Sequence, residues 1–195
     1  ELTNKLPEPP AYFPANVKLN QEGYDDLDIV MKKSLKNINP NEFDQLIKHD
    51  NVVVLDTRDS DTFIKYHFPN SIFVGLNGRF APWVGEVLKD VNTPIIIVTH
   101  SGKEKEVIMR LSRIGFDNCI GYINIDNKEQ AIEYIAPISI KCIHPKEFVK
   151  SKKNSRIVDV RTEREFNEGS YKTAKNIPLN KIYDKIEDVS DQSFV

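Results

Sequence analysis

Residues 95–103 read Ile-Ile-Ile-Val-Thr-His-Ser-Gly-Lys, a continuous apolar run followed by a short polar loop with one glycine. An apolar run of mostly β-branched residues, bounded by polar ones, is typical of a strand in a parallel sheet that is covered on both faces. The next residues carry an apolar stripe at helical spacing, formed by Val107, Ile108, Leu111 and Ile114. Gly115 is expected to end this helix. The stretch therefore predicts a strand, a loop and a helix.

Similar elements lie on both sides of this stretch. Further apolar runs at 52–55 and 119–123 predict two more strands. Helical patterns cover residues 24–36, 42–48, 60–66, 82–88 and 103–114. Strands that alternate with helices predict an α/β fold with an open parallel sheet flanked by helices and joined by right-handed crossovers.

Two parts of the chain resemble one another. Residues 38–43 (Ile-Asn-Pro-Asn-Glu-Phe) match residues 143–148 (Ile-His-Pro-Lys-Glu-Phe), and residues 54–58 match residues 157–161. We interpret this as a tandem repeat of about 100 residues, a common domain size. A first complete unit is expected at 36–140. A second unit at 141–195 holds only its N-terminal half, since a complete copy would need roughly 50 residues more.

An unfinished parallel sheet leaves an apolar edge uncovered. A homo-oligomer is one way in which that edge would be covered.

Composition limits the classes of partner and location. The 27 Lys and Arg against 29 Asp and Glu give a net charge of -2, and the basic residues are scattered, which argues against nucleic acid as a partner. No apolar run is long enough for a membrane helix, and no secretory signal is present, so we expect a cytoplasmic protein without a membrane partner. Residues 1–35 are rich in proline and are expected to form a linker.

The loop Thr99, His100, Ser101, Gly102 and Lys103 is the first place to look for chemistry, because ligands of open α/β sheets bind where strands end and helices begin. Its backbone N–H groups and the helix N-terminus favour an anion. Glu104 and Glu106 weaken that potential. His100 and Ser101 suggest a base and a nucleophile, but adjacent residues seldom pair in that way and no third orienting group is evident.

The order of motifs resembles the rhodanese homology domain. The residues that carry this resemblance are Asp56-Thr57-Arg58, Phe63, His67-Phe68-Pro69-Asn70-Ser71-Ile72 and the glycine loop, and in the second unit Asp159-Val160-Arg161, Glu165-Phe166 and residues 174–178. Rhodaneses carry a transferable sulfur on a cysteine in a Cys-x-x-Gly arrangement, and counting back from Gly102 puts Thr99 at that position. The resemblance therefore implies a catalytically silent domain, a pseudo-rhodanese. The equivalent position of the second unit would fall at about 202, beyond Val195.

A narrower resemblance rests on residues 6–14 and 75–85, the latter with Trp83. These segments are similar to the region that follows the metallo-β-lactamase-fold domain in bacterial fusion proteins of a persulfide dioxygenase and a rhodanese. The resemblance implies an absent N-terminal domain with non-haem iron, which would be the partner of this chain. A low-molecular-weight persulfide or thiosulfate would be the sulfur source, and no cofactor is expected in this chain.

The remaining candidate residues have structural interpretations. Asp56 with Arg58, and Asp159 with Arg161, are expected to bond loop backbone or each other and to shape the site without reacting. Cys119 and Cys142 are expected to be buried small hydrophobes, and neither neighbourhood predicts an activated thiolate. Trp83 is expected to pack, with an interdomain contact as the alternative.

Two functions follow from these observations. The first is a non-catalytic, structural or docking region of a sulfur-metabolising persulfide dioxygenase and sulfurtransferase. The alternative is an active module, either a sulfurtransferase that uses Cys119 or Cys142, or an anion-binding, phosphatase-like module that uses the Thr99–Lys103 loop.

Overall fold

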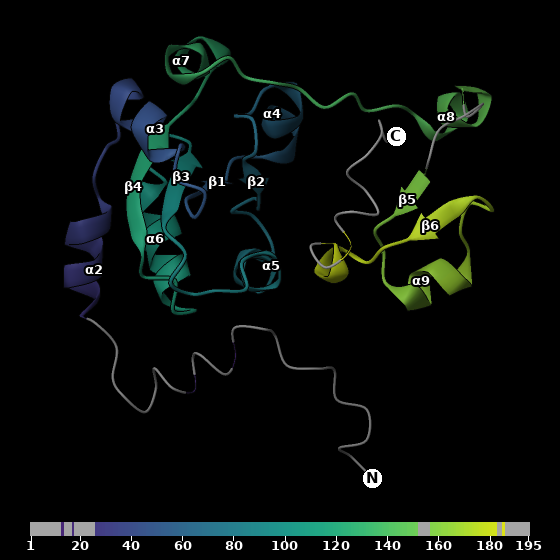
Figure 1. Ribbon diagram of the computed structural model, residues 1–195, viewed down its shortest axis with the longest axis horizontal. Helices are drawn as coiled ribbons and strands as arrows, with labels where there is room; N and C mark the ends of the chain where they lie inside the picture. Colours follow the sequence, from purple (N-terminus) through teal and green to yellow (C-terminus); the bar gives the residue numbers. More distant parts are fainter. Residues whose placement is uncertain (1–12, 14–16, 18–25, 152–156, 183–184, 186–195) are drawn as a thin grey trace. The chain divides into compact units, whose positions relative to one another are not determined.

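The computed structural model describes residues 13, 17, 26–151, 157–182 and 185 (Figure 1). The chain divides into two compact units, Glu1–Lys141 and Cys142–Val195, and each is described by itself. Most of the proline-rich segment predicted to be a linker lies outside the described residues. No helix within the described ranges is long and apolar enough to cross a membrane.

The first unit is built on a parallel sheet. Its strands are β1 (Val53–Asp56), β2 (Ile72–Phe73), β3 (Ile95–Thr99) and β4 (Cys119–Asn124), in the order β2-β1-β3-β4. Every pair in this order is parallel. The predicted open parallel α/β sheet is confirmed, and β3 lies in its interior because its apolar run has no polar residue to present to water.

Helices connect and flank these strands. They are α2 (Leu27–Ser34), α3 (Pro40–Leu46), α4 (Ser60–Lys65), α5 (Phe80–Val87), α6 (Glu104–Ser112) and α7 (Lys128–Tyr134). Side-chain caps set several starts: Asn39 caps α3, Asp59 caps α4 and Asn127 caps α7. Gly115, at φ 80°, follows the end of α6. The elements α7 and β2 were not predicted.

The sheet separates two apolar layers, because successive residues of a strand point to opposite faces. On one face, Leu55, Ile95 and Ile97 pack with buried residues of α2, α5 and α6, namely Val30, Phe80, Val84, Val107, Ile108 and Leu111. On the other face, Val54, Ile96 and Val98 pack with Phe43 of α3 and Ala131 of α7. The sheet is therefore covered on both sides, as a parallel sheet requires.

The outer edge of β4 is closed by the segment that precedes α3. The N–H of Ile38 donates to the carbonyl of Tyr122 at 2.9 Å, and the N–H of Tyr122 donates to the carbonyl of Lys36 at 2.8 Å. A Cβ at Gly121 would lie 2.7 Å from the carbonyl oxygen of Lys36. Glycine at this position therefore permits the close approach that covers the edge.

The second unit contains α8 (Pro145–Ser151), β5 (Ile157–Asp159), α9 (Glu163–Glu168), β6 (Ala174–Asn176) and a 3-10 helix (Leu179–Lys181). Strands β5 and β6 are parallel. A capping box between Thr162 and Glu165 begins α9. Within the described part of this unit, β5 pairs with β6 alone. Residues 152–156, 183–184 and 186–195, which belong to the predicted half-domain, lie outside the described residues.

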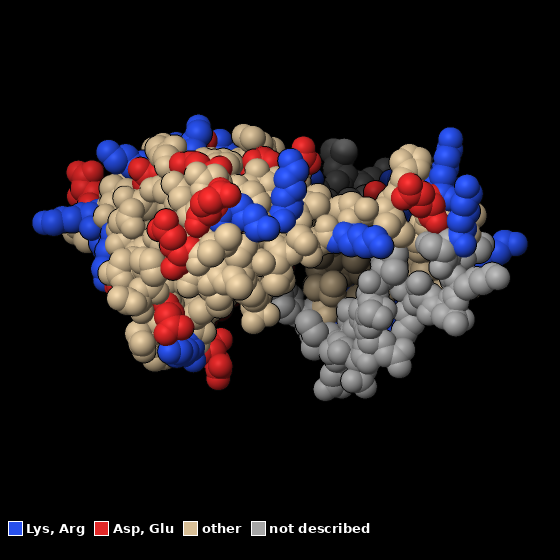
Figure 2. Space-filling model, turned by 90° about the horizontal axis from the view of Figure 1, so that it is seen from above, with Lys and Arg blue, Asp and Glu red and all other residues tan. Residues whose placement is uncertain are grey.

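Charges of both signs are mixed on the surface. In Figure 2, Lys and Arg side chains lie interspersed with Asp and Glu over the face in view. Among the described residues visible on that face, the basic side chains form no extended patch of the kind that binds a phosphate backbone.

Candidate functional site

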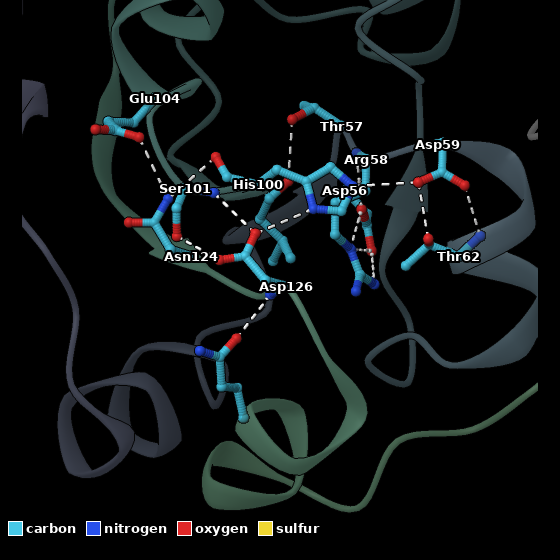
Figure 3. A network of polar contacts seen from close by, with 12 residues as sticks. Asp56, Thr57, Arg58, Asp59, Thr62, His100, Ser101, Glu104, Asn124 and Asp126 are labelled. Atoms are coloured by element: carbon cyan, nitrogen blue, oxygen red, sulfur yellow. Dashed lines mark hydrogen bonds and ion pairs between the residues drawn. The ribbon is translucent and has the colours of Figure 1, made fainter.

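Three loops meet at the carboxyl end of the first unit's sheet. They follow β1, β3 and β4, and they lead into α4, α6 and α7 respectively. Because parallel strands end at the same edge, side chains from positions far apart in the sequence converge there (Figure 3). The side chains that meet are Asp59 from the first loop, His100 and Ser101 from the second, and Asp126 from the third.

Asp126 is the centre of this cluster. Its Oδ1 accepts a hydrogen bond from the backbone N–H of Ser101 at 3.0 Å and lies 3.2 Å from His100 Nδ1. Its Oδ2 accepts a hydrogen bond from the Ser101 hydroxyl. The bond from that hydroxyl is the main cause that lowers the pKa of Asp126 below its ordinary value. The carboxylate is therefore ionised at neutral pH and holds the start of the β3–α6 loop.

His100 links the loop to a second carboxylate. Its Nε2 lies 3.1 Å from Asp59 Oδ2, so both ring nitrogens face carboxylate oxygens on separate loops. Desolvation raises the pKa of Asp59, but hydrogen bonds from the Thr62 hydroxyl, the Thr62 N–H and His100 outweigh it and hold this pKa far below its ordinary value. His100 thus connects the loops that follow β1 and β4.

This geometry does not form a nucleophile and base pair. The Ser101 hydroxyl donates to Asp126 and makes no hydrogen bond with His100. Both ring nitrogens of His100 are engaged by carboxylates, so neither is left to take a proton from a nucleophile. The residues missed from the sequence, Asp59 and Asp126, are the partners that orient His100 away from Ser101.

Thr99 is the last residue of β3 and is 1 % exposed. The sequence placed it at the first position of the loop, but its carbonyl accepts a hydrogen bond from the N–H of Ile125 at 3.0 Å, which continues the β3–β4 pairing. The residue expected to replace a sulfur-carrying cysteine is therefore enclosed in the sheet.

The remaining loop residues turn the chain into α6. Gly102 has φ 81°, and a Cβ at this position would have no heavy atom within 4 Å, so the glycine meets a backbone requirement and not a steric one. Lys103 Nζ lies 3.2 Å from Glu106 Oε2, and the two side chains form an exposed ion pair at the start of α6. Glu104 Oε2 accepts a hydrogen bond from Asn124 Nδ2 at 3.3 Å. The loop region therefore carries a third carboxylate in addition to Asp59 and Asp126.

Asp56 and Arg58 form a buried pair at the end of β1. Arg58 Nε and Nη2 donate to the Asp56 carboxylate, at 3.0 Å and 2.6 Å, and Nη2 also donates to the carbonyl of Tyr66 at 3.0 Å. The guanidinium carbon lies 4.9 Å from the centre of the Tyr66 ring. These bonds hold the loop against the turn after α4 and engage the Asp56 carboxylate, while Arg58 Nη1 is buried without a hydrogen-bond partner among the described residues.

Asp159 and Arg161 repeat this arrangement in the second unit. Arg161 Nε and Nη2 donate to the Asp159 carboxylate, at 3.0 Å and 2.6 Å, and Nη2 donates to the carbonyl of Gly169 at 2.9 Å. The Arg161 hydrogen bond is the main cause that lowers the pKa of Asp159. The Arg161 side chain is 46 % exposed.

The two cysteines differ. Cys119 is buried, as predicted, and burial raises the pKa of its thiol to about 12. The expectation that Cys142 is buried was wrong: Cys142 is exposed, because it lies in a connecting segment outside the helices and strands. Trp83, expected to pack, is half exposed on α5.

The rhodanese-like domain family matches residues 39–125 of the chain. This part of the chain is a rhodanese-like domain. The match covers β1 to β4 and the loop at Thr99, and it ends one residue before Asp126. No curated protein sequence matches the chain.

Solved structures similar to the chain include wild-type EanB, with 11 % identity over 80 % of this chain and 42 % of that chain, at a TM-score of 0.49. An EanB variant in complex with hercynine has 12 % identity over 75 % and 41 %, at 0.48. The Alr3790 protein from Anabaena sp. has 15 % identity over 47 % and 71 %, at 0.39. The chain thus spans about two fifths of the length of EanB.

Proposed function

We propose that the rhodanese-like domain is a non-catalytic, structural or docking region of a sulfur-metabolising persulfide dioxygenase and sulfurtransferase. The observation that carries the proposal is Thr99, buried at the end of β3 in the position that the Cys-x-x-Gly arrangement gives to the sulfur-carrying cysteine. A threonine hydroxyl does not hold a persulfide, and it is a poor nucleophile without an adjacent base.

Charge at the loop supports the same conclusion. Thiosulfate is a dianion, and it would approach a loop bordered by Asp59, Asp126 and Glu104 (Figure 3). Two like charges 4 Å apart repel by about 1 kcal/mol in water and by more near a protein surface. The same repulsion acts on a phosphate monoester, so it also counts against the phosphatase-like alternative.

In this proposal, the iron chemistry belongs to another domain of the parent protein. Its non-haem iron would lie in an N-terminal metallo-β-lactamase-fold domain, and segments 6–14 and 75–85 are the basis for that part of the proposal. Among the described residues no three His, Cys, Asp or Glu side chains are grouped to hold a metal ion. In this proposal, the rhodanese-like domain would contact the domain that holds the iron.

A thiosulfate and cyanide assay tests the proposal. The purified chain is incubated with both compounds and thiocyanate is measured, with an active rhodanese as positive control. We expect no thiocyanate above the protein-free rate.

The Cys119→Ala/Cys142→Ala variant separates the two ways in which the proposal would fail. Thiocyanate that disappears in this variant would identify a cysteine as a sulfur carrier. Thiocyanate that persists in it would place chemistry at the Thr99–Lys103 loop. Either result would overturn the non-catalytic assignment.

A further inference from the structure

The β3–α6 loop already binds a negatively charged group of the chain itself, the side-chain carboxylate of Asp126. Asp126 accepts hydrogen bonds from the N–H and the hydroxyl of Ser101 and faces the Nδ1 of His100. We propose that Asp126 is a specificity-determining residue that excludes anionic sulfur donors from this loop by occupying the N–H and the hydroxyl of Ser101. The inference rests on the proposed function, because it gives a reason why this non-catalytic domain would not bind anionic sulfur donors.

The donors are of the kind that an external anion would use. Ser101 precedes Gly102, whose φ of 81° turns the chain into α6, so the loop's N–H groups lie near the start of a nine-residue helix. Backbone N–H groups at a helix start favour a negative group. Each donor hydrogen serves one strong acceptor at a time, so an external anion competes directly with the Asp126 carboxylate.

Asp126 is held in place from its own side of the site. Its backbone N–H donates to Gln130 Oε1 at 2.7 Å, and the next residue, Asn127, caps α7 through a bond from the N–H of Gln130 at 3.0 Å. The carboxylate is therefore presented by a fixed turn. Displacing it would leave an ionised group beside the incoming anion.

The two neighbouring carboxylates have different partners. Asp59 accepts from Thr62, through which it caps α4, and lies near His100. Glu104 accepts from Asn124. Of the carboxylates named here, Asp126 is the one that contacts Ser101. Glu104→Gln is thus a matched control, since it removes the same charge from the same loop region and leaves the Ser101 donors occupied.

The experiment is a titration of the whole 195-residue chain with sodium thiosulfate, followed by the backbone amide signals of Ser101 and Gly102 in NMR spectra. Sodium chloride at matched ionic strength corrects for screening. We compare the wild-type chain with Asp126→Ala, Asp126→Asn and Glu104→Gln. The spectra also report whether each variant is folded, and Asp126→Asn replaces Asp126→Ala if the alanine variant is not.

We expect no saturable shift in the wild-type chain or in Glu104→Gln. In Asp126→Ala we expect saturable shifts of the Ser101 and Gly102 signals, with an affinity at least tenfold above any wild-type binding. A wild-type chain that binds thiosulfate at this loop as tightly as the Asp126 variants would overturn the inference. So would an equal gain in Glu104→Gln, because charge removal alone would then explain the effect.

The two proposals fail in different ways. Thiocyanate formation by the wild-type chain would refute the proposed function, whatever the titration shows. Thiosulfate binding at Ser101 of the wild-type chain, as tight as in the Asp126 variants and without thiocyanate formation, would refute the role of Asp126 and leave the proposed function intact.

Discussion

Arg58 and Arg161 lie 103 positions apart (161 − 58) and make the same set of hydrogen bonds in different surroundings. Each bonds the carboxylate of the aspartate two residues earlier and the carbonyl eight residues later. The side chain of Arg58 is 1 % exposed and that of Arg161 is 46 % exposed. The same ion pair therefore occurs once in a low dielectric and once in contact with water.

This difference predicts unequal costs of removing the two arginines. Arg58→Met leaves the buried Asp56 carboxylate unpaired, so we expect it to lower the free energy of unfolding by about 3–5 kcal/mol. Arg161→Met is expected to cost much less, because the Arg161 side chain is 46 % exposed and water screens its ion pair with Asp159. Urea unfolding measures both costs. The fluorescence of Trp83, the single tryptophan, reports the effect of Arg58→Met, and amide signals of β5 and α9 report the effect of Arg161→Met. Equal costs would contradict this account.

The loop carboxylates predict a pH dependence of stability. The pKa values of Asp59 and Asp126 are lower in the folded chain than the unfolded value of about 3.9. Their contribution is therefore present above about pH 4 and is lost as the pH falls through the folded pKa values. We expect Asp126→Asn to lower the thermal midpoint modestly at pH 7, because the site is half exposed, and we expect its difference from wild type to shrink below about pH 4.

Thermal unfolding followed by circular dichroism from pH 7 to pH 2 measures this dependence. Asp61→Asn, which removes a carboxylate from the first turn of α4, is the control and should leave the wild-type pH dependence in place. A difference between Asp126→Asn and wild type that stays constant over the whole range would speak against the ionised carboxylate as its source.

The cysteines predict one reactive thiol in the folded chain. Cys142 is exposed, whereas Cys119 is buried and its pKa of about 12 leaves very little thiolate at pH 8. We expect an aromatic disulfide reagent to modify one thiol rapidly under native conditions and two after denaturation. Cys142→Ser should abolish the rapid phase. Two rapid thiols in the native chain would show that the core around β4 opens readily.

The strands and most of the helices were predictable because their signals are local. The runs at β1, β3 and β4 contain almost no polar residues, and α6 has a regular apolar stripe. Two elements were missed because they lack such signals. β2 has two residues, too few to show alternation, and α7 buries only Ala131 while Ile132 is exposed.

The site was only partly predictable because it is assembled from three loops. The sequence located the loop at Thr99 but not its partners Asp59 and Asp126, which lie 40 and 27 positions away (99 − 59 and 126 − 99). Signals for both were present. Asp59 lies three residues before Thr62, the spacing of a helix N-cap and the residue that it caps. Asp126 follows the apolar pattern of β4, in the same way that Asp56 follows the apolar residues of β1. Convergence at one edge follows from strand order, which local patterns do not contain.

The Asp56–Arg58 closure and the β3–α6 loop lie at the ends of different strands, and the closure uses no atom of that loop. Substitutions that change reactivity at Thr99 or Ser101 therefore leave the closure of β1 untouched. The hydrogen bonds that hold the end of β1 therefore do not depend on which side chains occupy the β3–α6 loop. In this fold, the side chains that hold β1 in place and the side chains that line the candidate site are separate sets.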